Sequence, residues 1–218
     1  MTRTVVGALV NRRSLLASLG DAVEGAPYKG APRAVVLQLK PRHTWVGAGG
    51  ALAVDAATPA LEVDATLGLV IGRRAVRLSA DDRAAALAHV AALVLVADAH
   101  ASLESHHRPS ARQRARDASC AIGAATPLAG LDPDRLVLRT FVDGRPVAAS
   151  DPADAIRGAA ALLAAVTDFM ALEPGDVLLL GSPPGGPRVQ AGQTVRIEAD
   201  GLAALEVGVA ADPAETAP

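Results

Sequence analysis

The sequence predicts a β-rich α+β domain, and three observations support this fold class. Short apolar segments bounded by turn residues recur along the 218 residues. Three dipeptides suited to hairpin turns separate such segments, at Gly72-Arg73, Asp143-Gly144 and Asp200-Gly201. Only two stretches are long and apolar enough for substantial helices. A doubly wound sheet needs a helix after nearly every strand, so that architecture is excluded.

The first quarter of the chain is expected to hold short strands, one short helix and a loop. The helix covers 14–23, with Ser14 as its cap, because a serine hydroxyl can accept from the first free backbone amides. A loop follows over 25–34, where two prolines and two glycines interrupt any regular pattern. The strands are expected within 4–10, 34–41 and 47–54.

The middle of the chain is expected to form a hairpin, a helix and a buried strand. Residues 66–79 are predicted as two strands around Gly72-Arg73. A helix follows, opened by Asp81 and Asp82, which suit the positive end of a helix dipole. It leads into a strand with the sequence "VLVADAH".

The last third is predicted to contain the longest helix, over 151–172. Asp151 is placed as its cap and Pro152 in its first turn. A buried strand and a Gly/Pro loop follow within 173–187. We expect one domain over 1–211, with 1–30 as a lid or N-terminal segment, and a frayed tail over 212–218.

Composition excludes several functional classes. The net charge of −2 argues against nucleic acid as a partner, since phosphate binding needs a concentrated positive face. The single cysteine, Cys120, excludes an internal disulfide and fits a reducing compartment. The apolar run 84–100 is too short to span a membrane and carries His89. We therefore expect a soluble, cytoplasmic protein with no membrane contact.

A pair of oxygen-bearing side chains stands at the start of an apolar strand. Asp64 and Thr66 share one face of that strand, about 7 Å apart by the strand rise. Together with Asp98 from another strand end they could hold a hard divalent ion such as Mg²⁺. The alternative is an ordinary solvent-facing aspartate at a strand edge.

Two polar clusters follow that strand, and each has two interpretations. Zinc ligation by Asp98, His100, His106 and His107 competes with a simple loop of surface histidines. The arginines of "RPSARQRARD" form either a solvated basic loop or a clamp for a substrate with several carboxylates, which the forked guanidinium suits. The loop 181–187 adds the hydroxyl of Ser182 and backbone amides, or is only a turn.

Several ordered segments resemble the fumarylacetoacetate hydrolase family over nearly the whole chain. They are "YKGAPRAVVLQLKPRHTWVGAGG", "LEVDATLGLVIGR", "VLVADAHASLESHHRP", "RARDASCAIGAATPL", "LRTFVDGRPV", "FMALEPGDVLLLGSPPGG" and "QAGQTVRIEADGLAALE". Within the family they are most similar to the first subunit, or N-terminal half, of a two-part isomerase/decarboxylase of 4-hydroxyphenylacetate (homoprotocatechuate) degradation. The resemblance implies a flattened, mostly antiparallel β-roll flanked by short helices, usually paired into dimers.

The resemblance also implies a metal site. Catalytic members hold Mg²⁺ or Mn²⁺ through a Glu-x-Glu pair and a later Asp, and the metal chelates a 2-oxo carboxylate and stabilises its enolate. In this chain the matching positions are Asp64, Thr66 and Asp98, so one carboxylate is missing. The family's catalytic lysine is replaced by Arg114, and Lys40 matches the lysine of its Lys-Pro strand end.

Substrate contacts carry over less completely. Ser182 stands at the threonine of the usual Gly-Thr-Pro, and Arg116 belongs to the same basic segment as Arg114. In the lid motif "VNRRS" Arg12 is retained, but Ser14 stands where the family has the histidine that activates water. These departures argue against hydrolysis.

Three functions therefore remain open. The first is a subunit of the isomerase/decarboxylase that acts on 5-oxopent-3-ene-1,2,5-tricarboxylate and 2-hydroxyhepta-2,4-diene-1,7-dioate. The second is a non-catalytic scaffold that has lost its metal and pairs with a competent subunit. The third is an enzyme for another 2-oxo acid. In each case we expect a homodimer, or a heteromer with a second chain of the same family.

Overall fold

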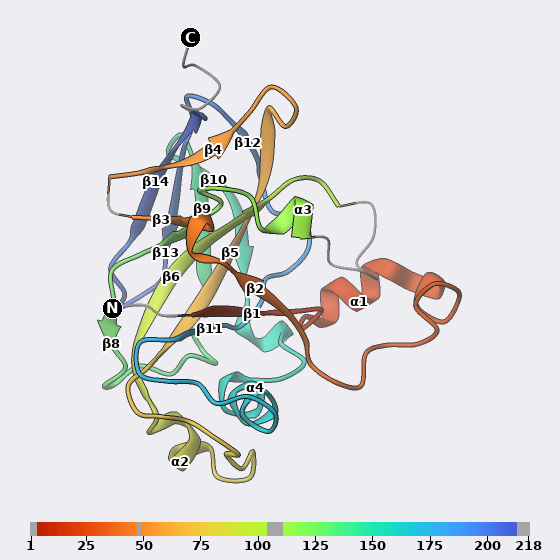
Figure 1. The fold of residues 1–218 in the computed structure, drawn as a ribbon, viewed down its shortest axis with the longest axis vertical. Helices are drawn as coiled ribbons and strands as arrows, with labels where there is room; N and C mark the ends of the chain where they lie inside the picture. Colours follow the sequence, from red (N-terminus) through yellow and green to blue (C-terminus); the bar gives the residue numbers. More distant parts are fainter. Residues whose placement is uncertain (1–3, 48, 104–110, 213–218) are drawn as a thin grey trace.

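The computed structural model describes residues 4–47, 49–103 and 111–212, and within these ranges the chain forms two β-sheets with short helices at their margins (Figure 1). Nine of the twelve strand pairings are antiparallel. The prediction of a β-rich, mostly antiparallel α+β fold is thus confirmed. Among the described residues, no helix has the length and apolarity that crossing a membrane requires.

The larger sheet has nine strands and carries Lys40, Asp64, Thr66 and Asp98. Its main path runs in the order β2 (Val36–Lys40), β1 (Val5–Leu9), β11 (Val177–Leu179), β5 (Ala60–Ile71), β6 (Val90–His100), β7 (Cys120–Ile122) and β3 (Trp45–Val46), while β12 (Arg188–Gln190) pairs with β5 and β8 (Thr126–Pro127) with β6.

The two ends of this strand order are neighbours in the sequence. Strand β2 ends at Lys40, and the 3₁₀ turn η2 (Arg42–Thr44) leads directly into β3, which pairs with β7 at the far edge. The indole Nε1 of Trp45 donates to the Lys40 carbonyl at 2.8 Å and ties this connection together. The sheet therefore curls into a roll that brings the β2 edge back toward β6 and β7.

The smaller sheet has five strands and covers one face of the roll. Its order is β10 (Arg145–Ser150), β9 (Leu138–Val142), β13 (Thr194–Glu198), β14 (Leu205–Ala211) and β4 (Ala51–Val54). The helices are α1 (Arg13–Leu19), α2 (Arg83–Leu87), α3 (Ala111–Arg114) and α4 (Ala159–Thr167), and two further 3₁₀ turns are η1 (Gly20–Val23) and η3 (Pro152–Asp154).

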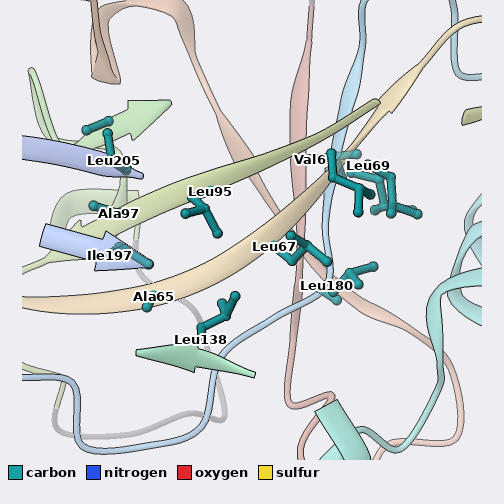
Figure 2. Packing of buried hydrophobic residues seen from close by; sticks show 14 of the residues in the cluster. Val6, Ala65, Leu67, Leu69, Leu95, Ala97, Leu138, Leu180, Ile197 and Leu205 are labelled. Carbon is teal, nitrogen blue, oxygen red and sulfur yellow. The ribbon is translucent and has the colours of Figure 1, made fainter. Parts of the chain in front are cut away.

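The core lies between the two sheets because successive side chains of a strand point to opposite faces. Odd-numbered residues of β5 and β6, such as Leu67 and Leu95, are buried against Leu138, Ile197 and Leu205 of the smaller sheet (Figure 2). The even-numbered residues point the other way. At one end of that second face they form a small apolar cluster, and at the other end they are polar.

Two of the three predicted hairpins are present. The turns at Asp143-Gly144 and Asp200-Gly201 join β9 to β10 and β13 to β14, both antiparallel. The hairpin predicted at Gly72-Arg73 is wrong, since β5 ends at Ile71 and pairs with the later strand β6. A Cβ on Gly72 would lie 2.6 Å from the Ala91 side chain, so this glycine serves close packing rather than a turn.

The predicted helices are shorter in the structure. The helix predicted over 151–172 is in fact the turn η3, capped by Asp151, followed by α4. The chain is extended between them because Ala155 forms a β-bridge with Arg12. Helix α4 begins at Ala159, whose amide donates to Asp134.

The remaining helix predictions need similar corrections. Helix α2 covers only Arg83–Leu87, and Asp82 caps it by accepting from the Ala85 amide. Ser14 is not a cap, since it lies inside α1 and its amide and hydroxyl both donate to Asp154.

Candidate functional site

The polar residues of the second sheet face come from two adjacent strands. In the antiparallel pair β5–β6, Asp64 lies directly opposite Asp98, and Glu62 lies opposite His100. Thr66 follows two residues after Asp64 and therefore faces the same way. All of these except Glu62 are buried. The sequence-based expectation that oxygen-bearing side chains from separate strands meet at one place is met by this register.

These side chains line a pocket of about 100 Å³. Asp64, Thr66 and Asp98 form one wall, and Arg114, from helix α3, and Ser182, from the loop after β11, also line it. Five residues that the sequence singles out thus share one pocket although they come from four separate segments. Lys40 does not line the pocket, but its ammonium group pairs with Asp98, which does.

Asp98 is surrounded by donors. Its Oδ1 forms an ion pair with the ammonium of Lys40, whose side chain is fully buried. Its Oδ2 accepts from Nε2 of Gln38 at 2.5 Å and lies 3.8 Å from Nη1 of Arg114. Lys40 Nζ also donates to the Arg114 carbonyl at 2.6 Å, which fixes α3 next to the pocket. The curl of the sheet produces this cluster, because it carries β2 back toward β6.

Asp64 has a different cationic partner. Nε2 of His100 lies 3.2 Å from Asp64 Oδ2, and the other ring nitrogen, Nδ1, lies 2.9 Å from the Ala101 carbonyl. Both nitrogens therefore face acceptors, which favours the doubly protonated imidazolium. Burial lowers the pKa of His100, but the hydrogen bond and charge of Asp64 outweigh burial and raise that pKa above its ordinary value of 6.5.

Two predicted substrate contacts lie outside the pocket. The buried guanidinium of Arg12 donates to the Gly181 carbonyl through Nε at 3.2 Å and Nη2 at 2.7 Å, and Nη1 donates to the Asp151 carbonyl at 3.0 Å. Burial lowers the pKa of Arg12, although Asp154 and Asp151 oppose this effect. Arg12 thus holds the loop that carries Ser182 instead of facing the pocket.

Arg116 points in another direction. Its guanidinium pairs with Asp55, and both residues line a separate surface depression.

The loop 181–187 approaches Asp64 closely, since a Cβ on Gly186 would lie 2.7 Å from Asp64 Oδ1 and 2.4 Å from the Val63 carbonyl oxygen. Only glycine allows this approach.

The sequence prediction did not include Gln38 or Glu62 and considered His100 only as a zinc ligand, yet all three line the pocket. Each lies two residues from an assigned residue on the same strand: Lys40, Asp64 and Asp98 respectively. The period of two was therefore the missed signal. His106 and His107 of the zinc alternative lie outside the described residues, and within the described ranges no group of three metal-ligating side chains forms.

The donor set does not fit the divalent ion that the family resemblance implies. Mg²⁺ and Mn²⁺ need several free oxygen ligands, usually including carboxylates. Asp64 is engaged by His100, Asp98 is engaged by Lys40 and Gln38, and Thr66 offers only a neutral hydroxyl. A dication placed between the two carboxylates would compete with the Lys40 ammonium for Asp98 and would lie close to the Arg114 guanidinium.

Comparison with known proteins places this site in a family context. The family model described as fumarylacetoacetate (FAA) hydrolase C-terminal matches residues 4–210. The chain is 34% identical over 206 residues to the 4-hydroxyphenylacetate degradation bifunctional isomerase/decarboxylase of Escherichia coli, covering 94% of this chain and 47% of that protein. The protein of the same name from Salmonella dublin is 34% identical over 212 residues, with 97% and 48% covered. The chain thus spans about half the length of these curated relatives.

Solved structures share the fold. The 5-carboxymethyl-2-hydroxymuconate delta-isomerase from Mycobacterium smegmatis superposes with a TM-score of 0.78 at 25% identity, covering 97% of this chain and 80% of that one. The fumarylpyruvate hydrolase from Pseudomonas aeruginosa, crystallised with Mn²⁺ and pyruvate, gives a TM-score of 0.79 at 24% identity, covering 97% and 91%. At that identity the second likeness shows the fold alone. With the family match spanning nearly every residue, the chain belongs to the fumarylacetoacetate hydrolase family.

Proposed function

We propose that this chain is one half of a two-part isomerase/decarboxylase of 4-hydroxyphenylacetate degradation, acting on unsaturated 2-oxo or 2-hydroxy acids with several carboxylates. The observation that carries the proposal is the buried Arg114, which lines the same pocket as Ser182 and whose Nη1 lies 3.8 Å from Asp98 Oδ2. A guanidinium at such a wall suits a substrate carboxylate. Relatives that carry this activity in their names match the chain along about half of their own length, and this supports a second family unit as the partner of this chain.

The proposed roles follow from the contacts. Arg114 binds a substrate carboxylate, and Ser182 offers its hydroxyl to the same group. Asp98 and Lys40 are positioning residues, because Asp98 faces Arg114 and Lys40 holds the backbone of α3 through the Arg114 carbonyl. Arg12 maintains the loop of Ser182 from outside the pocket. Arg116 is left out of the substrate-binding set, since its charge is paired with Asp55.

Assembly and cofactor are part of the proposal. We expect a cytoplasmic homodimer or a heteromer with a second chain of the same family, and that second chain would supply any Mg²⁺ or Mn²⁺ chemistry. The metal is assigned to the partner because Asp64 and Asp98 of this chain are already engaged by His100 and Lys40.

A second function is favoured by the same ion pairs. Because Asp64 and Asp98 are both engaged, this second function is that of a non-catalytic scaffold, which pairs with a competent subunit. The two functions differ in whether substrate enters this chain's pocket.

The deciding experiment is an assay of 5-oxopent-3-ene-1,2,5-tricarboxylate decarboxylation with this chain, the second family chain and their mixture. If this pocket is used, Arg114→Gln should lower kcat/KM of the mixture by about tenfold or more, because a charge-assisted hydrogen bond is lost. Arg112→Gln is the matched control, since Arg112 lies on the same helix but is exposed. An unchanged rate for Arg114→Gln would leave the scaffold function standing.

A further inference from the structure

Asp98 Oδ1 makes an ion pair with the Lys40 ammonium; apart from it, two buried side-chain atoms of the described pocket residues have no partner within hydrogen-bond distance. One is Nη1 of Arg114, which is a donor, and the other is Oε1 of Gln38, which is an acceptor. Arg114 is 6% exposed and Gln38 is 9% exposed, and both line the pocket. Buried polar groups in folded proteins are nearly always satisfied, so a pair of unsatisfied ones at a pocket wall indicates the chemistry of a ligand.

The orientation of the Gln38 amide is fixed by its neighbour. Nε2 donates to Asp98 Oδ2 at 2.5 Å, and the reverse orientation would set two acceptor oxygens against each other. Oε1 therefore remains free to accept. Arg114 Nη1 lies 3.8 Å from the same Asp98 oxygen, so the free donor and the free acceptor flank one carboxylate.

A ligand that satisfies both atoms must present an acceptor to Arg114 and a donor to Gln38. A carboxylate with a neighbouring hydroxyl has this pattern, as in a 2-hydroxy acid or in the enol form of a 2-oxo acid. A 2-oxo carbonyl only accepts and would leave Oε1 unsatisfied. In addition, Asp98 already has a cationic partner within the protein, because its Oδ1 forms an ion pair with the Lys40 ammonium.

We propose that this pocket binds the 2-hydroxy (enol) form of its carboxylate substrate without a divalent cation, through Arg114 and Gln38. The class of acid rests on the proposed function. The inference adds that the pocket selects the enol tautomer of this acid and that binding requires no divalent cation. It assigns a specificity role to Gln38, which touches the group that distinguishes the hydroxy acid from the 2-oxo acid.

The test is isothermal titration calorimetry of the full chain, alone, with 2-hydroxyglutarate, 2-oxoglutarate and glutarate as probes. In EDTA, 2-hydroxyglutarate should bind about three- to tenfold more tightly than either other probe, the effect of one added hydrogen bond. Mn²⁺ added to EDTA-free protein should give no saturable heat and should leave the affinity for 2-hydroxyglutarate unchanged. Binding that requires Mn²⁺, equal affinity for the three probes, or no binding of any probe would each overturn the inference.

Variants assign the effect to residues. Gln38→Leu should remove the preference for 2-hydroxyglutarate over glutarate, while Arg114→Gln should weaken both by about tenfold or more. Arg112→Gln should bind as the wild type does. Thermal unfolding shows whether each variant is folded. If Gln38→Leu does not fold, the relative affinities of the wild type for the three probes still test the inference. Because no turnover is measured, failure here is separate from failure of the decarboxylation assay.

Discussion

His100 on β6 reaches diagonally across the strand pair to Asp64 on β5, with Nε2 3.2 Å from Oδ2, although its direct cross-strand partner is Glu62. The diagonal contact leaves Asp98, the direct partner of Asp64, to Lys40 of the distant strand β2. Two adjacent carboxylates are thus neutralised from opposite sides. As a result of this separation of partners, both carboxylates at the wall of the pocket are engaged within the protein.

The first prediction concerns the pH dependence of stability. The pKa of His100 is raised in the folded protein, so its protonation stabilises the fold. That contribution is fully present below pH 6.5, the ordinary value, and is lost as the pH rises through the higher folded-state pKa. The difference in unfolding free energy between wild type and His100→Gln should therefore shrink over that window in denaturant titrations.

Asp64→Asn provides the control for this prediction. Without the carboxylate, His100 loses the hydrogen bond and the charge that raise its pKa. In the Asp64→Asn background the effect of His100→Gln should no longer shrink as the pH rises. A dependence that persists there would show that another group is responsible.

The second prediction concerns Arg12. Its three hydrogen bonds to the Gly181 and Asp151 carbonyls are made inside the protein, and removing a buried charged donor leaves those acceptors unsatisfied. We expect Arg12→Gln to lower the unfolding free energy by about 2–4 kcal/mol. Arg13→Gln, at the exposed neighbour, should change it by less than about 0.5 kcal/mol. Equal losses in chemical denaturation would contradict the structural role of Arg12.

Much of the fold and part of the site could be predicted from local patterns. Alternation along one strand was enough to place Asp64 and Thr66 on the same face, whereas the position of Asp98 opposite Asp64 depends on the pairing of β5 with β6. The partners of these acids depend on the curl of the sheet, which brings Lys40 from β2 to Asp98 on β6. No local pattern encodes such a long-range approach, so the ion pairs could not be foreseen.

Local signals also failed where a residue serves tertiary packing. Gly72 was interpreted as part of a hairpin turn, but its lack of a side chain lets β5 approach Ala91. Arg12 was interpreted as a substrate contact because its charge matched a motif, but that charge is used on backbone carbonyls. In both cases the residue type marked a special position, but the sequence did not identify the residues that this position contacts.

The third prediction concerns Gly186, which packs against the Asp64 strand. A Cβ at this position would lie 2.4 Å from the Val63 carbonyl oxygen, so the loop or the strand must move. Gly186→Ala should lower the unfolding free energy by about 1–3 kcal/mol, the usual cost of overpacking. Gly208→Ala is the control, because its nearest atom would lie at 4.0 Å. Equal stability of the two variants in denaturant titrations would contradict the close approach.

The fourth prediction concerns the chemical reactivity of Cys120. Burial, with a smaller effect of Asp98, raises the pKa of its thiol to about 12, although Lys40 opposes the shift. The reactive thiolate is therefore scarce at pH 8, and the side chain is fully buried. Iodoacetamide should leave the native protein unmodified over the time in which it alkylates the same protein in guanidinium chloride, as measured by intact mass. Comparable rates in the two conditions would mean that β7 opens far more readily than a strand paired between β6 and β3 should.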